Sequence, residues 1–83
     1  KIDKPTKNAK VSNPFQVEGS VEGKADRVRV SCIYAQTEVS TETVDVKNGK
    51  WKAQLSGNPG AGYTVVALID GTDTEDRIEI RVE

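Results

Sequence analysis

The sequence predicts an all-β domain, built as an antiparallel sandwich of two sheets with about seven short strands. Apolar and polar residues alternate along several short runs, as they do in strands with one buried face. Turn-forming Gly, Asn, Asp and Pro residues separate these runs at a spacing of roughly 8–12 residues. No run of useful length shows the 3.6-residue period of a helix, so almost no helix is expected.

Length and composition exclude several kinds of function. The chain has 83 residues, enough for one domain, and a formal net charge of −1, so no nucleic-acid partner is expected. No segment offers the ~20 apolar residues that cross a bilayer, and membrane insertion is not expected. Histidine is absent and Cys32 is the only cysteine, which excludes histidine-dependent catalysis, imidazole-bound zinc and an internal disulfide. The chain begins without methionine, which suggests a piece of a longer polypeptide.

The polar, lysine-rich residues 1–13 are expected to form a linker with a short edge strand around Ala9–Ser12. Pro5 and Pro14 limit what can pair there, because proline has no backbone N–H to donate. The sandwich itself is expected over residues 14–83.

The first strands of the sandwich follow the two-residue alternation closely. Phe15–Val21 has one apolar and one polar face, and Arg27–Tyr34 places Cys32 and Tyr34 on its inward face with the valines. The following stretch, Gln36–Glu42, is rich in Thr, Ser and Glu and is either an edge strand or a loop.

A β-hairpin is predicted around Asn48-Gly49, between the alternating runs Thr43–Lys47 and Lys50–Leu55. A type I′ turn needs positive φ at both central residues, and Asn-Gly is the dipeptide that supplies this most readily.

The last third of the chain supplies a loop and two more strands. Ser56–Gly62 is a Gly/Pro loop, Tyr63–Asp70 is a strand, and Ile78–Val82 alternates in the final strand. Val66 and Leu68 make the second face of the Tyr63–Asp70 strand partly apolar, as expected for a central strand that is covered on both sides.

Several motifs together resemble bacterial immunoglobulin-like domains. Asn13–Val21 and Ala25–Val30 are similar to the opening strands of that family, Asn48–Leu55 to its Asn-Gly-x-Trp hairpin, and Gly62–Ala67 to its tyrosine strand. The resemblance spans roughly residues 11 to 82. It implies an immunoglobulin-like antiparallel β-sandwich in a surface protein, a secreted glycan-acting enzyme or a phage virion protein, where such modules act as spacers or adhesive units.

Trp51 is the only residue singled out as a ligand-binding candidate. Its register with Ala53 and Leu55 indicates a core position, and the alternative is an exposed platform on which a sugar ring stacks. Tyr34 is a possible second platform residue, although its alternation points it inward. Tyr63 follows a glycine-rich loop, which is the position of a tyrosine corner. Cys32 is expected to be a buried thiol.

No cofactor is expected, and calcium is the one metal considered. Asp70, Asp73 and Asp76 lie in an acidic turn that offers oxygen ligands. Many members of the family that this chain resembles hold calcium between tandem modules with an Asp/Asn-rich run at this place. Here the run lacks the usual asparagine, and solvated turn residues are the favoured interpretation.

The function predicted from the sequence is a non-catalytic spacer or adhesion module. Its expected partners are neighbouring domains of the same chain and a host-surface protein or glycan, at an extracellular site, on a cell surface or on a virion. The alternative is a carbohydrate-binding module of a secreted enzyme or phage fibre. The charged residues interleave in sign on the solvent faces, so binding is expected on the end loops, Gly71–Asp76 or Ser56–Gly62.

Overall fold

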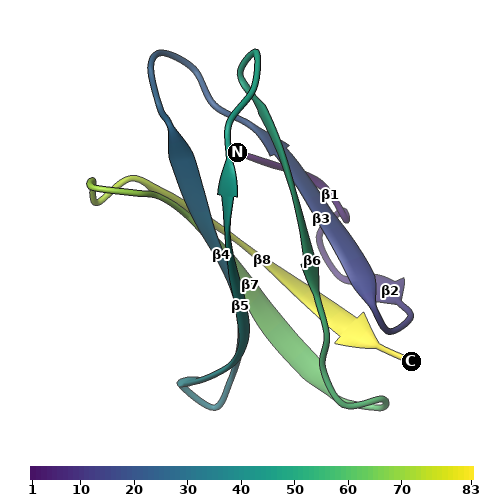
Figure 1. Cartoon of the computed structure of the whole chain (residues 1–83). Coiled ribbons are helices and arrows are strands. Elements are labelled where there is room, and N and C mark those ends of the chain that lie inside the picture. The colour runs from purple at the N-terminus through teal and green to yellow at the C-terminus, as the bar shows by residue number, and fades with distance from the viewer.

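Two β-sheets pack face to face in the computed structural model, which describes residues 1–83 (Figure 1). The three-stranded sheet has the strand order β1-β3-β6, and the five-stranded sheet has the order β2-β8-β7-β4-β5. The strands are β1 (Ile2–Lys4), β2 (Ala9–Val11), β3 (Phe15–Ser20), β4 (Arg27–Tyr34), β5 (Thr37–Asp45), β6 (Lys50–Leu55), β7 (Gly62–Ile69) and β8 (Glu75–Val82). The predicted all-β sandwich is confirmed, with eight strands where about seven were expected. None of the chain forms a helix with the length and apolar character needed to cross a membrane.

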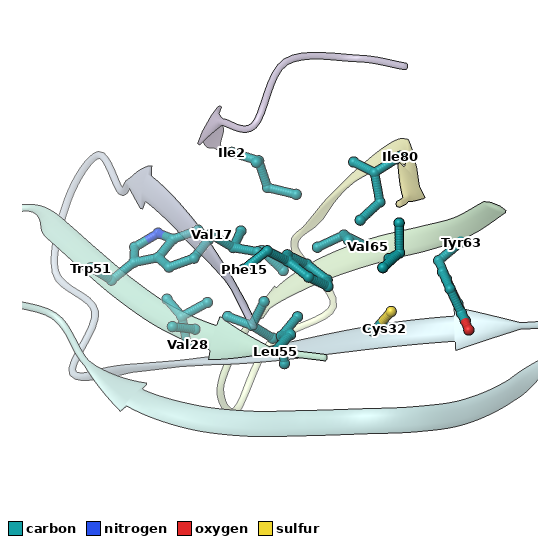
Figure 2. Close-up of a cluster of buried hydrophobic side chains, with 14 residues drawn as sticks. Ile2, Phe15, Val17, Val28, Cys32, Trp51, Leu55, Tyr63, Val65 and Ile80 are labelled. Atoms are coloured by element: carbon teal, nitrogen blue, oxygen red, sulfur yellow. The ribbon is translucent and has the colours of Figure 1, made fainter. Parts of the chain in front are cut away.

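Alternate residues of the strands fill the space between the sheets. In β6, for example, Trp51, Ala53 and Leu55 are buried, whereas the residues between them are exposed. Figure 2 shows side chains from both sheets meeting in one cluster. The fourteen buried members of this cluster are Ile2, Phe15, Val17, Val28, Val30, Cys32, Trp51, Ala53, Leu55, Tyr63, Val65, Ala67, Ile80 and Val82.

Part of the segment expected as a linker, residues 1–13, is built into the sandwich. β1 pairs antiparallel with β3 and buries the Ile2 side chain, because Ile2 is the one large apolar residue near this end of the chain. The chain then passes to the other sheet, where β2 pairs with β8 and sets Ala9 opposite Ile80. This pair is parallel, which corrects the expectation of purely antiparallel sheets. β2 also realises the short edge strand expected in this segment.

The turn at Asn48-Gly49 forms as predicted, but the hairpin stops after one pair. Asn48 has φ 54° and Gly49 has φ 75°, and Lys47 and Lys50 exchange both backbone hydrogen bonds. Beyond this pair, β5 joins β4 and β6 joins β3, so the turn carries the chain from one sheet to the other. A predicted ladder between Thr43–Lys47 and Lys50–Leu55 is therefore wrong, because both strands find longer partners in different sheets.

Side chains of β5 cover the open edge of β6. The Glu42 carboxylate accepts a hydrogen bond from the Gln54 N–H (3.2 Å), and the Ser40 hydroxyl accepts one from the Ser56 N–H (3.4 Å). β5 is itself the outermost strand of the five-stranded sheet, and seven of its nine residues are exposed. Of the two structures allowed for Gln36–Glu42, the edge strand is the one that forms.

Candidate functional site

Trp51 lies in the core, with only 3% of its surface exposed. It stands opposite Gly19 in the β3–β6 pair, and its ring occupies the space that a side chain at position 19 would need. Figure 2 shows the indole among the side chains between the sheets. Its Nε1 is buried without a hydrogen-bond partner. Neither face of the ring is open to a ligand, so the sugar-platform interpretation of Trp51 is wrong and the core interpretation holds.

Tyr63 forms the tyrosine corner expected from its position. Its hydroxyl oxygen accepts a hydrogen bond from the Asn58 N–H at 2.6 Å, and its ring is buried at the end of the core (Figure 2). Gly57 leaves room for the ring, since a Cβ there would lie 2.7 Å from a ring carbon. The Asn13 side chain bonds both backbone groups of Gly57 and fixes the loop from outside. The Ser56–Gly62 loop is thus tied to the sandwich.

Cys32 is fully buried between the sheets. Desolvation by burial raises the pKa of its thiol from the ordinary value of 9.0 to about 11. The thiol is therefore protonated near neutral pH and out of contact with solvent, as expected for a cysteine that packs as a small apolar residue.

The acidic turn does not bring its carboxylates together. No three His, Cys, Asp or Glu side chains gather closely enough to hold an ion, so Asp70, Asp73 and Asp76, the calcium candidates from the sequence, are not clustered as a group. Both carboxylate oxygens of Asp76 accept backbone hydrogen bonds, from Ile2 (2.8 Å) and from Arg77 (3.0 Å). The turn itself is closed by the Thr72 hydroxyl, which donates to the Ile69 carbonyl at 2.8 Å.

The outer face of the five-stranded sheet carries charges that pair with one another. Arg29 lies 3.0 Å from Glu38, which also accepts a hydrogen bond from the Ser31 hydroxyl at 3.0 Å. Arg77 pairs with Glu75 at 3.2 Å. A shallow cleft of about 390 Å³ lies between these pairs. The apolar residues on its floor are Ile33, Val66 and Leu68.

One end of the sandwich holds a cleft that the sequence did not indicate. Tyr34 is 53% exposed, which corrects its expected inward position. It is the last residue of β4 and lies beside a cleft of about 470 Å³ between the β4–β5 turn and the β7–β8 pair. The turn that ends β4 is Ala35-Gln36, which lacks the usual turn residues. The alternation of apolar and polar residues predicted an inward side chain for Tyr34. Because Ala35-Gln36 contains no typical turn residue, the sequence did not mark the end of this strand.

The opposite end has a more polar cleft. It holds about 610 Å³ between the β3–β4 loop and the start of the β7–β8 loop, and includes Lys24, Asp26, Arg27 and Asp70. Arg27 is paired loosely there with Asp45 at 3.8 Å. This cleft contains few apolar groups and no aromatic ring.

Comparison with known proteins supports the fold and no more. No protein-family model matches the sequence, and no curated protein matches it. Among solved structures, an engineered protein determined as a target of the Northeast Structural Genomics Consortium superposes with a TM-score of 0.75 at 22% sequence identity. The match covers 100% of this chain and 19% of the engineered chain, so this chain spans about a fifth of that protein's length. The likeness shows a shared two-sheet β-sandwich.

Proposed function

We propose that this domain is an immunoglobulin-like module that spaces neighbouring domains of a larger extracellular bacterial or phage protein and presents its ends for adhesion. The strand arrangement supports the assignment. A three-stranded sheet faces a five-stranded sheet, and a tyrosine at the start of β7 bonds backbone five residues upstream. Immunoglobulin-like sandwiches share this architecture and carry such a corner at the same place.

The observation that carries the spacer role is the position of the first and last residues along the molecule. The Lys1 carbonyl accepts a hydrogen bond from the Ser20 N–H at 2.9 Å, close to the Asn48-Gly49 turn. Glu83 donates to the Val11 carbonyl at 2.8 Å, at the other end of the sandwich (Figure 1). The body between them is 37 Å long and 21 by 17 Å across. Domains attached at these points would lie end to end.

The match to part of a longer chain agrees with a modular role, because the same fold occurs there within a larger protein. The proposal assigns no reaction to the domain. The chain has no histidine, its single thiol is buried, and the charges on the outer face of the five-stranded sheet are paired with each other. Its surface is suited to contact and spacing.

Small-angle X-ray scattering on two copies of residues 1–83 joined directly in tandem tests the proposal. The expected maximum dimension exceeds that of the single domain by about 37 Å, the length of one body. The same pair joined by a flexible Gly/Ser linker is the control, and it is expected to show a broad distribution of distances. A directly joined pair that packs side by side, with an increase nearer 17 to 21 Å, would contradict the spacer role.

A further inference from the structure

Strand β5 presents a long, open backbone edge. It is the outermost strand of the five-stranded sheet and spans nine residues, seven of them exposed. The strands at other edges of the sandwich are short or covered: β1 and β2 have three residues each, and the Ser40 and Glu42 side chains bond the backbone of β6. β5 pairs only with β4, so its other side has no partner strand.

The backbone groups on this open edge belong to Thr41, Thr43 and Asp45. Along a strand, the N–H and C=O groups of successive residues point alternately to its two sides. The Val46 N–H, directly after β5, donates to the Asp26 carbonyl on the β4 side at 2.9 Å. The pairing with β4 is regular over this stretch. Asp45, Thr43 and Thr41 therefore direct their N–H and C=O groups away from β4, to the open side.

β5 lacks the residues that usually keep an open edge from pairing. Its sequence, TEVSTETVD, contains no lysine, arginine or proline, and five of its nine residues are the β-branched threonine and valine. Its one irregularity lies near the β4–β5 turn, where the register shifts between Cys32 and Ile33, so the stretch from Ser40 to Asp45 stays regular. Lysine, proline and bulges are the common means of blunting an edge. An edge without them is suited to receive another strand.

The charges on β5 select the kind of strand that can pair with it. Glu38, Glu42 and Asp45 are acidic, and the strand carries no basic side chain. Glu38 is satisfied by Arg29, whose guanidinium donates to both of its oxygens. The Asp45 side chain is 73% exposed and contacts Arg27 only loosely at 3.8 Å, and Glu42 accepts a single backbone hydrogen bond. Asp45 and Glu42 thus keep oxygens free for a cation on a neighbouring strand.

We propose that β5 binds an extended basic segment of a partner protein as a sixth strand of the five-stranded sheet. The segment exchanges backbone hydrogen bonds with Thr41, Thr43 and Asp45, and its lysine or arginine side chains pair with Asp45 and Glu42. A second copy of this domain is a poorer partner, because pairing two β5 strands brings three carboxylates from each together without a basic side chain on either. The inference goes beyond the spacer role and does not depend on it.

The octapeptide acetyl-Thr-Arg-Val-Thr-Arg-Thr-Val-Thr-amide tests the proposal by NMR titration of the ¹⁵N-labelled domain. In an antiparallel register its two arginines lie opposite Asp45 and Glu42. We expect the peptide to shift the amide signals of Thr41, Thr43 and Asp45 and to slow the hydrogen exchange of the same amides. N-methylation of the three peptide residues opposite these positions removes the donors and is expected to weaken binding about tenfold or more. A peptide with glutamate in place of both arginines should bind more weakly than the parent peptide.

Variants of the domain locate the binding on the edge. Thr43→Pro removes one edge N–H but no bond to β4, because this N–H points away from β4, and it is expected to weaken binding about tenfold. Thr43→Val is the matched control, since it keeps the N–H and the parent affinity. Asp45→Asn combined with Glu42→Gln removes two charges and should weaken binding about fivefold at low salt, with a smaller salt dependence. If Thr43→Pro does not fold, the N-methylated peptide tests the same hydrogen bonds on the parent domain.

Four results would each overturn the proposal. Equal binding of the arginine peptide and its N-methylated form would show that charge alone holds the peptide. Shifts confined to other faces would place the peptide elsewhere, and no shift at millimolar peptide would show that β5 does not accept a strand. Dimerisation of the domain through β5 in the absence of peptide, measured by sedimentation at increasing concentration, would identify a second copy as the partner instead.

Discussion

At the scale of single residues, Tyr63 and Tyr34 show what alternation can and cannot predict. The alternation of apolar and polar residues places both side chains on the inward faces of their strands, yet Tyr63 is buried and Tyr34 is exposed. The face on which a side chain lies depends only on the residue's place in its own strand. Burial depends on whether the facing sheet extends that far, and β4 runs past the end of the core before it turns. The burial of Trp51 was predictable because it shares the alternation of Ala53 and Leu55 in β6, and the structure adds that Gly19 stands opposite it.

The Tyr63 hydroxyl contributes stability through one hydrogen bond. Tyr63→Phe leaves the partly buried Asn58 N–H without an acceptor and is expected to lower the free energy of unfolding by about 1–2 kcal/mol. Tyr34→Phe is the matched control, since the Tyr34 hydroxyl has no hydrogen-bond partner in the protein, and it is expected to change stability by less than about 0.5 kcal/mol. Urea denaturation measures both. Equal losses in the two variants would contradict the tyrosine corner as a stabilising contact.

Because of the buried Cys32 thiol, the free energy of unfolding is expected to fall at alkaline pH. The folded protein holds the thiol proton more tightly, with a pKa of about 11 against 9.0 for the exposed group. Above pH 9 the unfolded chain therefore binds fewer protons than the folded one, and the thiol's contribution of about 2 kcal/mol is lost as pH rises toward 11. Denaturation at pH 8 and pH 11 of the parent and of Cys32→Val should show the steeper loss for the parent. Parallel losses would contradict a buried thiol.

At the scale of elements, the sequence predicted turns better than strand partners. The Asn48-Gly49 turn could be predicted locally, because Asn and Gly adopt the positive φ that this turn requires more readily than other residues do. The partner of each strand is chosen by residues far away, such as the Gly19 that accommodates Trp51. The short strands β1 and β2 were the least visible, since three residues are too few to display a period.

The covered edge of β6 leads to a prediction about amide exchange. Replacing both Ser40 and Glu42 with alanine removes the acceptors for the Gln54 and Ser56 N–H groups. These two amides are expected to exchange with solvent about tenfold faster, because their hydrogen bonds to β5 are lost. Hydrogen exchange followed by NMR is the measurement. Glu42→Gln alone keeps an acceptor and should leave Gln54 protected; unchanged exchange in the double variant would show that β5 does not cover this edge.

At the scale of the whole molecule, the first few residues join the two sheets. Ile2 enters the core beside β3, while its N–H donates to Asp76 in β8 of the opposite sheet at 2.8 Å. Composition gave no sign of this role, because the surrounding residues are polar and lysine-rich. The burial of Ile2 and its hydrogen bond to the Asp76 carboxylate attach the first residues of the chain to the sandwich.

Asp76→Ala tests that junction. The variant leaves the Ile2 N–H unpaired in a partly buried place, and a loss of about 1–3 kcal/mol of unfolding free energy is expected. The emission of Trp51 should also shift to the red, because Gly19, which the indole covers, touches the Lys1 backbone. Asp73→Ala, in the same acidic turn but without these hydrogen bonds, is the control. Identical stability and emission in the two variants would show that Asp76 does not hold β1.

The parallel pairing of β2 with β8 has a mechanical consequence. A pull on the two ends of the chain draws these strands along their lengths in opposite directions. The bonds that join them, including Asn8 N–H to Glu79 O (2.6 Å) and Glu83 N–H to Val11 O (2.8 Å), are then loaded side by side in shear. Bonds loaded together share the force and break together, whereas a strand pulled from one end separates one bond at a time. The short strand β2 is therefore expected to work as a clamp against extension, a property that the proposed spacer role would use.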